Sequence, residues 1–209
     1  MDMDIKFKQL AITLLPSGGL YIHTSQTLVL ADFHLGKGVL LQDSGVPLIG
    51  QVDQKTVTKL VNDLTFFSPK TCVICGDLIH AKSKHMPQQL AWFVDQLRQF
   101  DCEFVLTMGN HDANDYVNDL SIFTCVESFN VGGVVCVHEP RGDVPYIAGH
   151  IHPGVTIKKG RLKKTYKAFM VGDRGIVCPS YGETAGLFYT RDESSDYYYI
   201  KRGVLVRHD

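Results

Sequence analysis

Five short apolar segments of this sequence are each followed at once by Asp, His or Asn side chains. The segments are 28–31, 72–75, 104–108, 134–137 and 146–148, and the polar ends are Asp32-Phe33-His34, Gly76-Asp77, Gly109-Asn110-His111-Asp112, His138-Glu139 and Gly149-His150-Ile151-His152. Short apolar runs of this kind are typical of buried strands. Ligands of open α/β sheets bind beyond the carboxyl ends of strands. We therefore expect these polar side chains to meet at one edge of a sheet-based fold.

The first half of the chain alternates between strand-like and helix-like patterns. Strands are predicted at 10–15, 20–23, 27–31, 71–76 and 103–108. Apolar residues recur at roughly helical spacing from Val52 to Leu64, which predicts a helix that Ser68-Pro69 ends. Pro87 begins a second helix, whose inner face carries Leu90, Phe93, Val94 and Leu97. Such alternation predicts an α/β core with helices packed against a sheet.

After about Ser121 the pattern is mostly β. Strand-like segments at 131–137, 144–148, 165–171, 175–178 and 197–200 are separated by Gly-rich turns. No linker or low-complexity segment divides the chain, and 209 residues with 44% hydrophobic content suit one domain with a sizeable core. We predict an α/β sandwich of two sheets, with residues 1–209 forming a single domain.

Net charge, hydropathy and cysteine spacing indicate in which compartment the protein works and which partners it can attract. The net charge is −1, so attraction to nucleic acid has to come from a local patch. No apolar run approaches the roughly 20 residues of a membrane span, and the acidic start does not resemble a secretory signal. The six cysteines lack the spacing of a disulfide framework, and most lie in or beside apolar runs. We expect a cytoplasmic protein with buried free thiols and no membrane partner.

The polar strand ends have the composition of a metal site. Asp32 and His34 are alternate residues, as are His150 and His152, so each pair can grip one centre. Carboxylate, amide and imidazole groups suit Mn²⁺, Fe²⁺ or Zn²⁺. Seven candidate ligands are too many for one tetrahedral ion but suit two ions about 3.5–4 Å apart, bridged by a carboxylate. These candidates are Asp32, His34, Asp77, Asn110, His138, His150 and His152.

In order and type, the five blocks resemble those of the calcineurin-like metallophosphoesterases. Within that superfamily the sequence is similar to the bacterial DNA-ligase-associated (PdeM-like or ICC-like) phosphoesterases. This similarity rests on the run from Leu30 to Lys37, on His138-Glu139-Pro140 and on Gly149-His150-Ile151-His152-Pro153. It implies a two-sheet β-sandwich flanked by helices, in four α/β/β/α layers.

The resemblance also implies a role for each residue. One metal would be held by Asp32, His34 and His152, the other by Asn110, His138 and His150, and Asp77 would bridge both. A hydroxide between the metals would attack phosphorus in line with the leaving oxygen. His111 would neutralise charge or protonate the leaving group, and Asp112 would orient it. Mn²⁺ is the expected metal, with Fe²⁺, Zn²⁺ and Mg²⁺ as alternatives.

The second block bears on the substrate. Serine/threonine phosphatases carry Gly-Asp-x-x-Asp-Arg-Gly, whereas this chain reads Gly76-Asp77-Leu78-Ile79-His80, which looks like the Gly-Asp-Leu-Phe-His of double-strand-break repair nucleases. A phosphodiester is therefore the expected substrate. The residues that could contact it are His80, Lys37 and Arg141. The family branch implies DNA repair as the context, with a ligase and a helicase as partner proteins.

A basic run allows a second kind of contact. Six basic residues and no acidic one lie in segment 158–167, from Lys158 to Lys167. The run either tracks a DNA backbone or is a solvated hairpin whose charge protects a sheet edge. Two functional alternatives stay open beside the phosphodiesterase: a hydrolase of small nucleotides or pyrophosphates, and a non-catalytic nucleic-acid-binding scaffold.

Overall fold

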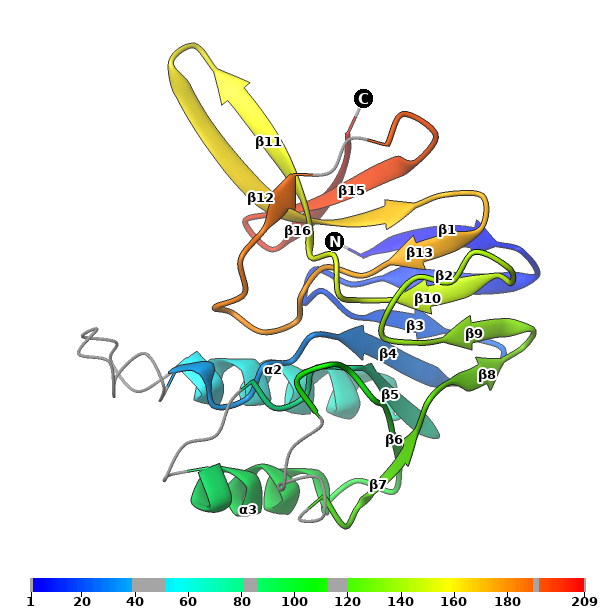
Figure 1. The fold of residues 1–209 in the computed structure, drawn as a ribbon, viewed down its shortest axis with the longest axis vertical. Helices are drawn as coiled ribbons and strands as arrows, with labels where there is room; N and C mark the ends of the chain where they lie inside the picture. The colour runs from blue at the N-terminus through cyan, green and yellow to red at the C-terminus, as the bar shows by residue number, and fades with distance from the viewer. Residues whose placement is uncertain (1, 39–51, 81–85, 113–119, 190–191, 209) are drawn as a thin grey trace.

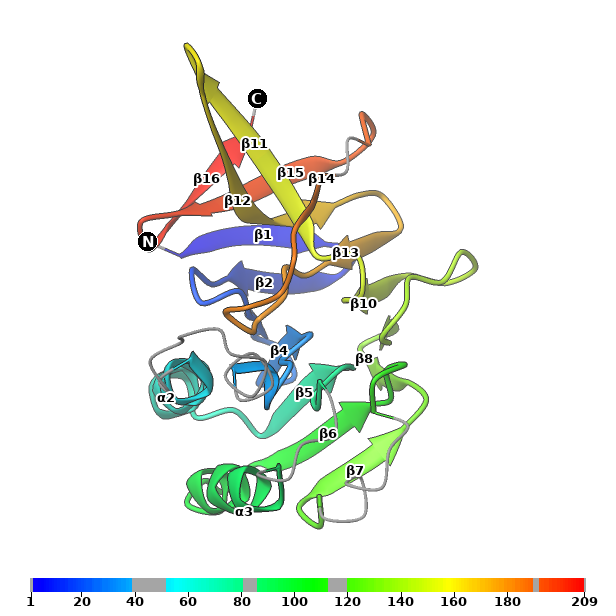
Figure 2. The same ribbon diagram turned by 60° about the vertical axis from the view of Figure 1, so that its left-hand side comes forward.

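The computed structural model describes residues 2–38, 52–80, 86–112, 120–189 and 192–208. Two β-sheets pack face to face, and both described helices cover the outer face of the first sheet (Figures 1 and 2). A hairpin of the second sheet projects beyond the body of the molecule. The predicted two-sheet α/β sandwich is confirmed.

The first sheet has seven strands in chain order. They are β1 (Met3–Phe7), β2 (Leu10–Leu14), β3 (Leu20–Ile22), β4 (Thr27–Ala31), β5 (Thr71–Cys75), β6 (Glu103–Thr107) and β7 (Phe123–Val126). Strands β1 to β4 are antiparallel, and β4 to β7 are parallel. The five strands predicted in this half are confirmed to within one residue. The sequence pattern does not predict β1 and β7, because these edge strands carry exposed side chains that interrupt the apolar runs.

Helices α2 (Val52–Phe67) and α3 (Met86–Leu97) occupy the predicted positions. Their apolar faces join one cluster with side chains of β4, β5 and β6. The contributing helix residues are Val57, Leu60, Leu64, Met86, Leu90, Phe93 and Leu97. Neither α2 nor α3 has the length and apolar character needed to cross a membrane.

The second sheet has the strand order β14-β11-β12-β13-β10-β9-β8, and β15 and β16 extend it from β12. The strands are β8 (Phe129–Val131), β9 (Val134–Cys136), β10 (Tyr146–Ala148), β11 (Pro153–Lys159), β12 (Leu162–Val171), β13 (Gly175–Val177), β14 (Phe188–Tyr189), β15 (Asp196–Lys201) and β16 (Val204–His208). The expectation of one strand over 131–137 is wrong. Gly132 and Gly133, with φ of 58° and 84°, turn this segment into a hairpin. Positive φ at both turn residues matches the twist of two-residue hairpins.

A second apolar cluster fills the space between the sheets. It includes Val29, Val73 and Val105 from the first sheet and Ile147, Phe169 and Ile176 from the second. In the described part of the chain the layers are therefore α/β/β. A helix layer on the outer face of the second sheet, as four layers require, is not among the described elements.

The cysteines agree only partly with the expected burial. All six are free; Cys72, Cys75, Cys136 and Cys178 are buried. Cys102 is half-buried, and Cys125, on the edge strand β7, is exposed.

The strand registers bring the polar ends together. Ala31 pairs with Cys75, and Cys75 with Thr107, so β4, β5 and β6 end at the same level. In the facing sheet β9 and β10 are also parallel neighbours. The residues that follow all five strands therefore meet at one end of the sandwich.

Candidate metal centre

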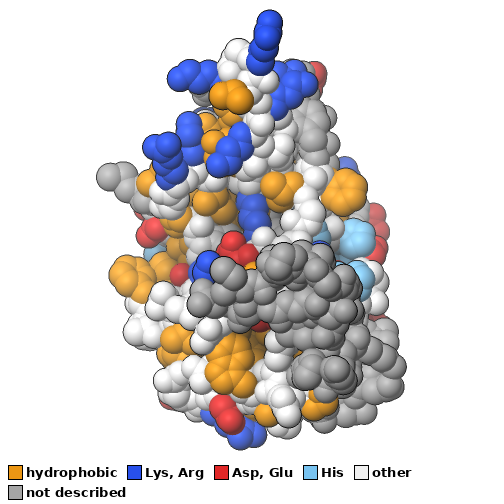
Figure 3. All heavy atoms as spheres, turned by 90° about the vertical axis from the view of Figure 1, so that its left-hand side faces the viewer, with side chains coloured by type: hydrophobic (Ala, Val, Ile, Leu, Met, Phe, Trp, Pro, Cys, Tyr) orange, Lys and Arg blue, Asp and Glu red, His pale blue; other side chains and the backbone are white. Residues whose placement is uncertain are grey.

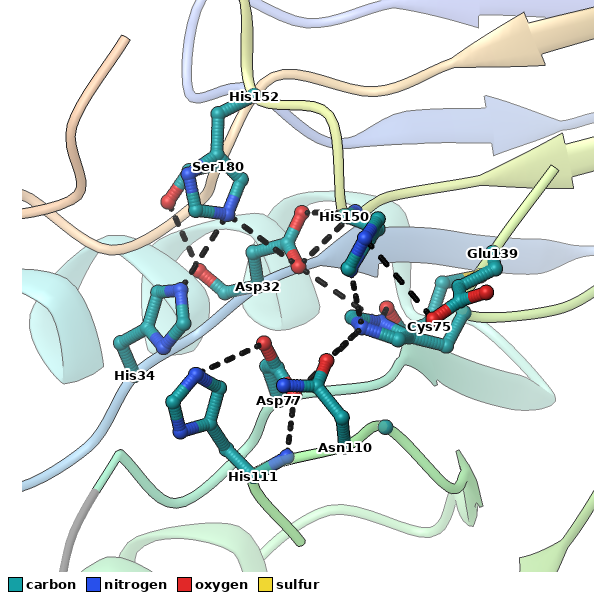
Figure 4. Close-up of polar contacts among 12 residues, drawn as sticks. Asp32, His34, Cys75, Asp77, Asn110, His111, Glu139, His150, His152 and Ser180 are labelled. Atoms are coloured by element: carbon teal, nitrogen blue, oxygen red, sulfur yellow. Dashed lines mark hydrogen bonds and ion pairs between the residues drawn. The ribbon is translucent and has the colours of Figure 1, made fainter. Parts of the chain in front are cut away.

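Figure 4 shows the polar side chains converging from the ends of five strands. Asp32 and His34 follow β4, Asp77 follows β5, Asn110 and His111 follow β6, His138 follows β9, and His150 and His152 follow β10. The structure thus brings together all seven candidate ligands named from the sequence.

The backbone of this centre is strained. Nine described residues other than glycine have positive φ, and five of them are candidate ligands: Asp32, His34, Asp77, His150 and His152. Each such residue costs roughly 1–3 kcal/mol unless its surroundings hold it in place. Backbone hydrogen bonds supply that restraint, because Asp32 N donates to Gly76 O (3.2 Å) and His34 N to Asp77 O (2.8 Å). Strain concentrated at these positions indicates a functional rather than a structural role.

Asp32, His34 and His152 form the first group of side chains that could hold a metal ion. Nε2 of His34 lies 3.3 Å from Nε2 of His152, which is 3.5 Å from Oδ1 of Asp32. With its proton on Nδ1, His152 donates to the carbonyl of Gly186 (3.1 Å), and Nε2 is left to accept. Burial, then the charges of His152, His80, Lys37 and His111, lower the pKa of His34 to about 2. The His34 imidazole is therefore neutral, the form that binds metal ions.

The second group surrounds His138, whose side chain is 4% exposed. Its Nε2 lies 3.0 Å from Oδ1 of Asn110 and 3.1 Å from Nδ1 of His150. Its Nδ1 faces the Cys75 carbonyl at 3.3 Å, so a proton there leaves Nε2 free to bind a metal. Glu139 completes the group, with Oε1 3.9 Å from Nε2 of His150. The sequence reasoning missed Glu139, although it stands next to His138.

Asp77 and Asp32, the latter a member of the first group, link the two groups. Their carboxylates and His138 form a third set of donor atoms within 4.8 Å of one another. Oδ1 of Asp77 is 3.6 Å from Nε2 of His138, and Oδ1 of Asp32 is 3.7 Å from Nδ1 of the same ring. Both carboxylates are almost completely buried, and buried charges of one sign need a cation nearby. Taken together, the three sets offer enough oxygen and nitrogen donors for two divalent ions that share a carboxylate.

Glycines make room for these carboxylates and imidazoles. A Cβ on Gly149 would lie 2.5 Å from Oδ2 of Asp32, and one on Gly76 would overlap the ring of His138. Gly76 also has a φ of +72°, which other residues rarely adopt. The Gly-Asp and Gly-His blocks therefore need glycine for space as well as for conformation.

A loop distant in sequence supports Asp32. Ser180 Oγ and Gly182 N each donate to the carbonyl of Asp32 at 3.0 Å. Nζ of Lys167 donates to the carbonyls of Ser180 and Gly182, and Nζ of Lys59 to that of Tyr181 (2.7 Å). The sequence reasoning missed this loop, because its contacts with Asp32 span about 150 residues and leave no local pattern.

His111 and Asp112 occupy the turn after β6. The His111 backbone N donates to Oδ1 of Asp77 (3.0 Å), and Nε2 of its half-exposed ring is 4.0 Å from Oδ2. Oxygens of Asp112 accept from the backbone N of Gly109 (3.0 Å) and of Ile79 (3.1 Å). Burial raises the pKa of Asp112. These contacts make Asp112 a brace between two loops, which positions His111 through the backbone.

The three candidate substrate contacts differ in their placement. The His80 ring stacks on His111 with centroids 5.2 Å apart, and its Nδ1 is 3.3 Å from Nδ1 of His34. Burial, then the charges of Lys37 and His111, lower the pKa of His80 to about 4. Burial also lowers the pKa of Lys37, whose backbone N donates to His34 O (3.3 Å). Arg141 lines a cavity of about 400 Å³ together with Asn110, His138 and Glu139.

Comparison with known proteins agrees with this geometry. The sequence profile of the calcineurin-like phosphoesterases matches residues 25–159. A solved structure of the nuclease MPE from Pseudomonas putida has a TM-score of 0.83 and 26% sequence identity, covering 99% of this chain and 100% of that one. No curated protein matches the sequence.

Proposed function

The chain belongs to the calcineurin-like phosphoesterases, metal-dependent hydrolases of phosphoester bonds, and on that premise we propose that it is a Mn²⁺-dependent phosphodiesterase that cleaves DNA. The observation that carries the proposal is that three sets of candidate metal ligands meet in one place, linked to one another through Asp32 and His138. Asp32, His34 and His152 would hold one ion, and Asn110, His138 and His150 the other. Asp77 would contact both.

The metal ions would supply charge neutralisation and an activated water. The protein side chains do the rest. His111 stands at the open side of the centre, where its half-exposed ring can donate to the phosphoryl group or to the leaving oxygen. Arg141 borders the cavity beside Asn110 and His138, in reach of a substrate phosphate there. Asp112 keeps the turn of His111 in place.

Two observations support a diester substrate. The segment Gly76-Asp77-Leu78-Ile79-His80 lacks the Asp-Arg pair of serine/threonine phosphatases, and His80 lies against His34 and His111 instead. The structurally similar protein from Pseudomonas putida is a nuclease. Resemblance to ligase-associated phosphoesterases supports a role in DNA repair, beside a ligase and a helicase.

Hydrolysis of a nitrophenyl phosphodiester and of the matching monoester tests the proposal, with Mn²⁺, Mg²⁺, Zn²⁺ or chelator. We expect diester cleavage with Mn²⁺, little monoester turnover, and none with chelator. Preference for the monoester would instead support a small-molecule phosphatase. Absence of turnover despite bound metal would leave a non-catalytic scaffold.

A further inference from the structure

The hairpin of β11 and β12 projects from the body of the molecule (Figures 1 and 2). Lys and Arg side chains gather at this end of the surface (Figure 3). The exposed basic residues of the hairpin are Lys158, Lys159, Arg161, Lys163 and Lys164. Lys167, the sixth basic residue of the run, is only partly exposed, and its Nζ donates to the carbonyls of Ser180 and Gly182. Burial, followed by the charge of Lys59, lowers the pKa of Lys167 to about 8.

Strand register divides the hairpin into two faces. Lys158 pairs with Lys163 and Thr156 with Thr165, on the face that also carries Lys167. We call Lys158, Lys163, Thr156 and Thr165 the inner ladder. Further along β12 the same face carries Phe169, which is buried between the two sheets. The inner ladder thus continues the inner side of the sandwich.

Packing accounts for the opposite, outer face. There Val155 and Tyr166 belong to an apolar cluster with Tyr197 and Tyr199. Nζ of Lys164 lies 5.1 Å from the centre of the Tyr166 ring, a cation–π contact. Among the described residues, Lys164 on the outer face thus has an aromatic partner, whereas Lys158 and Lys163 of the inner ladder have neither an ion pair nor a ring contact.

The inner ladder reduces the stability of the hairpin when no ligand is bound. Lys158 and Lys163 lie directly opposite each other, and like charges in that position destabilise a strand pair. No acidic residue occurs between 153 and 171 to neutralise them. Below them, the hydroxyls of Thr156 and Thr165 are 2.8 Å apart and keep spare hydrogen-bonding capacity. An anion in contact with both lysine ammonium groups would be attracted to each of them and would offset their mutual repulsion.

The inner ladder also leads to the metal centre. β11 begins immediately after His152, and Lys167 holds the loop that supports Asp32. From Lys167 to Lys163 the strand rises about 13 Å, at roughly 3.3 Å per residue. A chain of phosphates leaving the centre along the hairpin would meet the hydroxyls first and the two lysines next.

We propose that the inner ladder binds the phosphate backbone of a nucleic-acid strand that extends outward from the metal centre. Lysine ammonium and threonine hydroxyl groups suit phosphate oxygens and read no bases, so the contact would position the strand without sequence preference. The proposal rests on the proposed nuclease function, because it assigns the substrate's flanking phosphates to a defined surface.

Two double variants with equal charge change test it: Lys158→Gln/Lys163→Gln on the inner ladder and Lys159→Gln/Lys164→Gln on the outer face. Binding of a fluorescein-labelled DNA oligonucleotide to each full-length protein is followed by fluorescence anisotropy in EDTA, which prevents cleavage, at several salt concentrations. Melting temperatures show whether the hairpin stays folded. Turnover of the nitrophenyl diester by the unaltered protein with Mn²⁺ tests the enzymatic proposal separately.

We expect the inner variant to raise Kd about 10-fold or more, and to reduce the slope of log Kd against log salt by about 1.4, the value for two lost phosphate contacts on a single strand. Its melting temperature should not fall, since a like-charge pair is removed. The outer variant should change Kd by less than about 3-fold. Equal effects of the two variants, or an inner variant that binds like the unaltered protein, would overturn the proposal even if the diester is hydrolysed.

Discussion

Replacing Gly149 by alanine tests whether the packing around Asp32 sets metal affinity. The added Cβ would lie 2.5 Å from Oδ2 of Asp32 and 2.7 Å from Cβ of Ala31, both in buried residues. Gly149 has no positive φ, so alanine brings steric conflict without backbone strain. The carboxylate must retreat by about 1 Å to reach ordinary contact distance. Metal–ligand distances tolerate only about 0.2 Å, so the first donor set is broken.

The magnitude follows from those distances. The backbone N of His150 donates to both carboxylate oxygens of Asp32, at 2.9 and 3.1 Å, so a displaced carboxylate also loses these hydrogen bonds. We expect Mn²⁺ affinity to fall about 10- to 100-fold, as for other losses of support around metal ligands. Overpacking should lower the free energy of unfolding by about 1–3 kcal/mol.

Calorimetric titration of chelator-stripped protein with Mn²⁺, together with urea unfolding, measures both quantities. Gly142→Ala is the matched control, because a Cβ there meets nothing within 4 Å. The reasoning is refuted if Gly149→Ala binds Mn²⁺ as tightly as Gly142→Ala does.

Three further predictions concern catalysis, pH and the supporting loop. His111→Ala should keep the metal content, measured by mass spectrometry of the metals, but lose about 100-fold or more in diester turnover; unchanged turnover would remove His111 from the reaction. Burial and neighbouring charges hold the pKa of His34 at about 2, against about 6.5 when unfolded, so below pH 6.5 the unfolded chain binds the extra proton. As the pH falls below 6.5, the free energy of unfolding of the metal-free protein, measured with urea, should therefore decrease by up to about 1.4 kcal/mol per pH unit. The decrease should be smaller for His34→Asn, and an equal slope in the two proteins would contradict this. Tyr181→Phe removes the 2.9 Å bond to Oδ2 of Asp63 and should cost about 1–3 kcal/mol of unfolding free energy, whereas a loss below about 0.5 kcal/mol would show that this bond is unimportant.

Local patterns predicted the parts of the fold and site that local chemistry determines. The apolar runs before Asp32, Asp77 and His138 are strands whose ends lie together, because parallel neighbours in register finish at one level. Helices α2 and α3 could be predicted because their apolar spacing matches the face that packs on the first sheet.

What the pattern could not predict depends on contacts between distant segments. The apolar run 131–137 contains a turn, because two successive glycines adopt positive φ there although the valines around them favour a strand. Lys167 looks like its basic neighbours in the sequence, yet pleat and position direct it to the loop that holds Asp32. The side of a strand on which a charge falls is set by register, and register is fixed by partners elsewhere in the chain.

The number of Mn²⁺ ions bound per chain tests the central claim most directly. Chelator-stripped protein is titrated with Mn²⁺, and the bound metal is counted alongside diester turnover for the unaltered protein and for Asp77→Ala. We predict two ions per chain in the unaltered protein, and loss of both metal binding and turnover in Asp77→Ala. A single ion in the unaltered protein, or full turnover in Asp77→Ala, would contradict a two-metal centre built around this carboxylate.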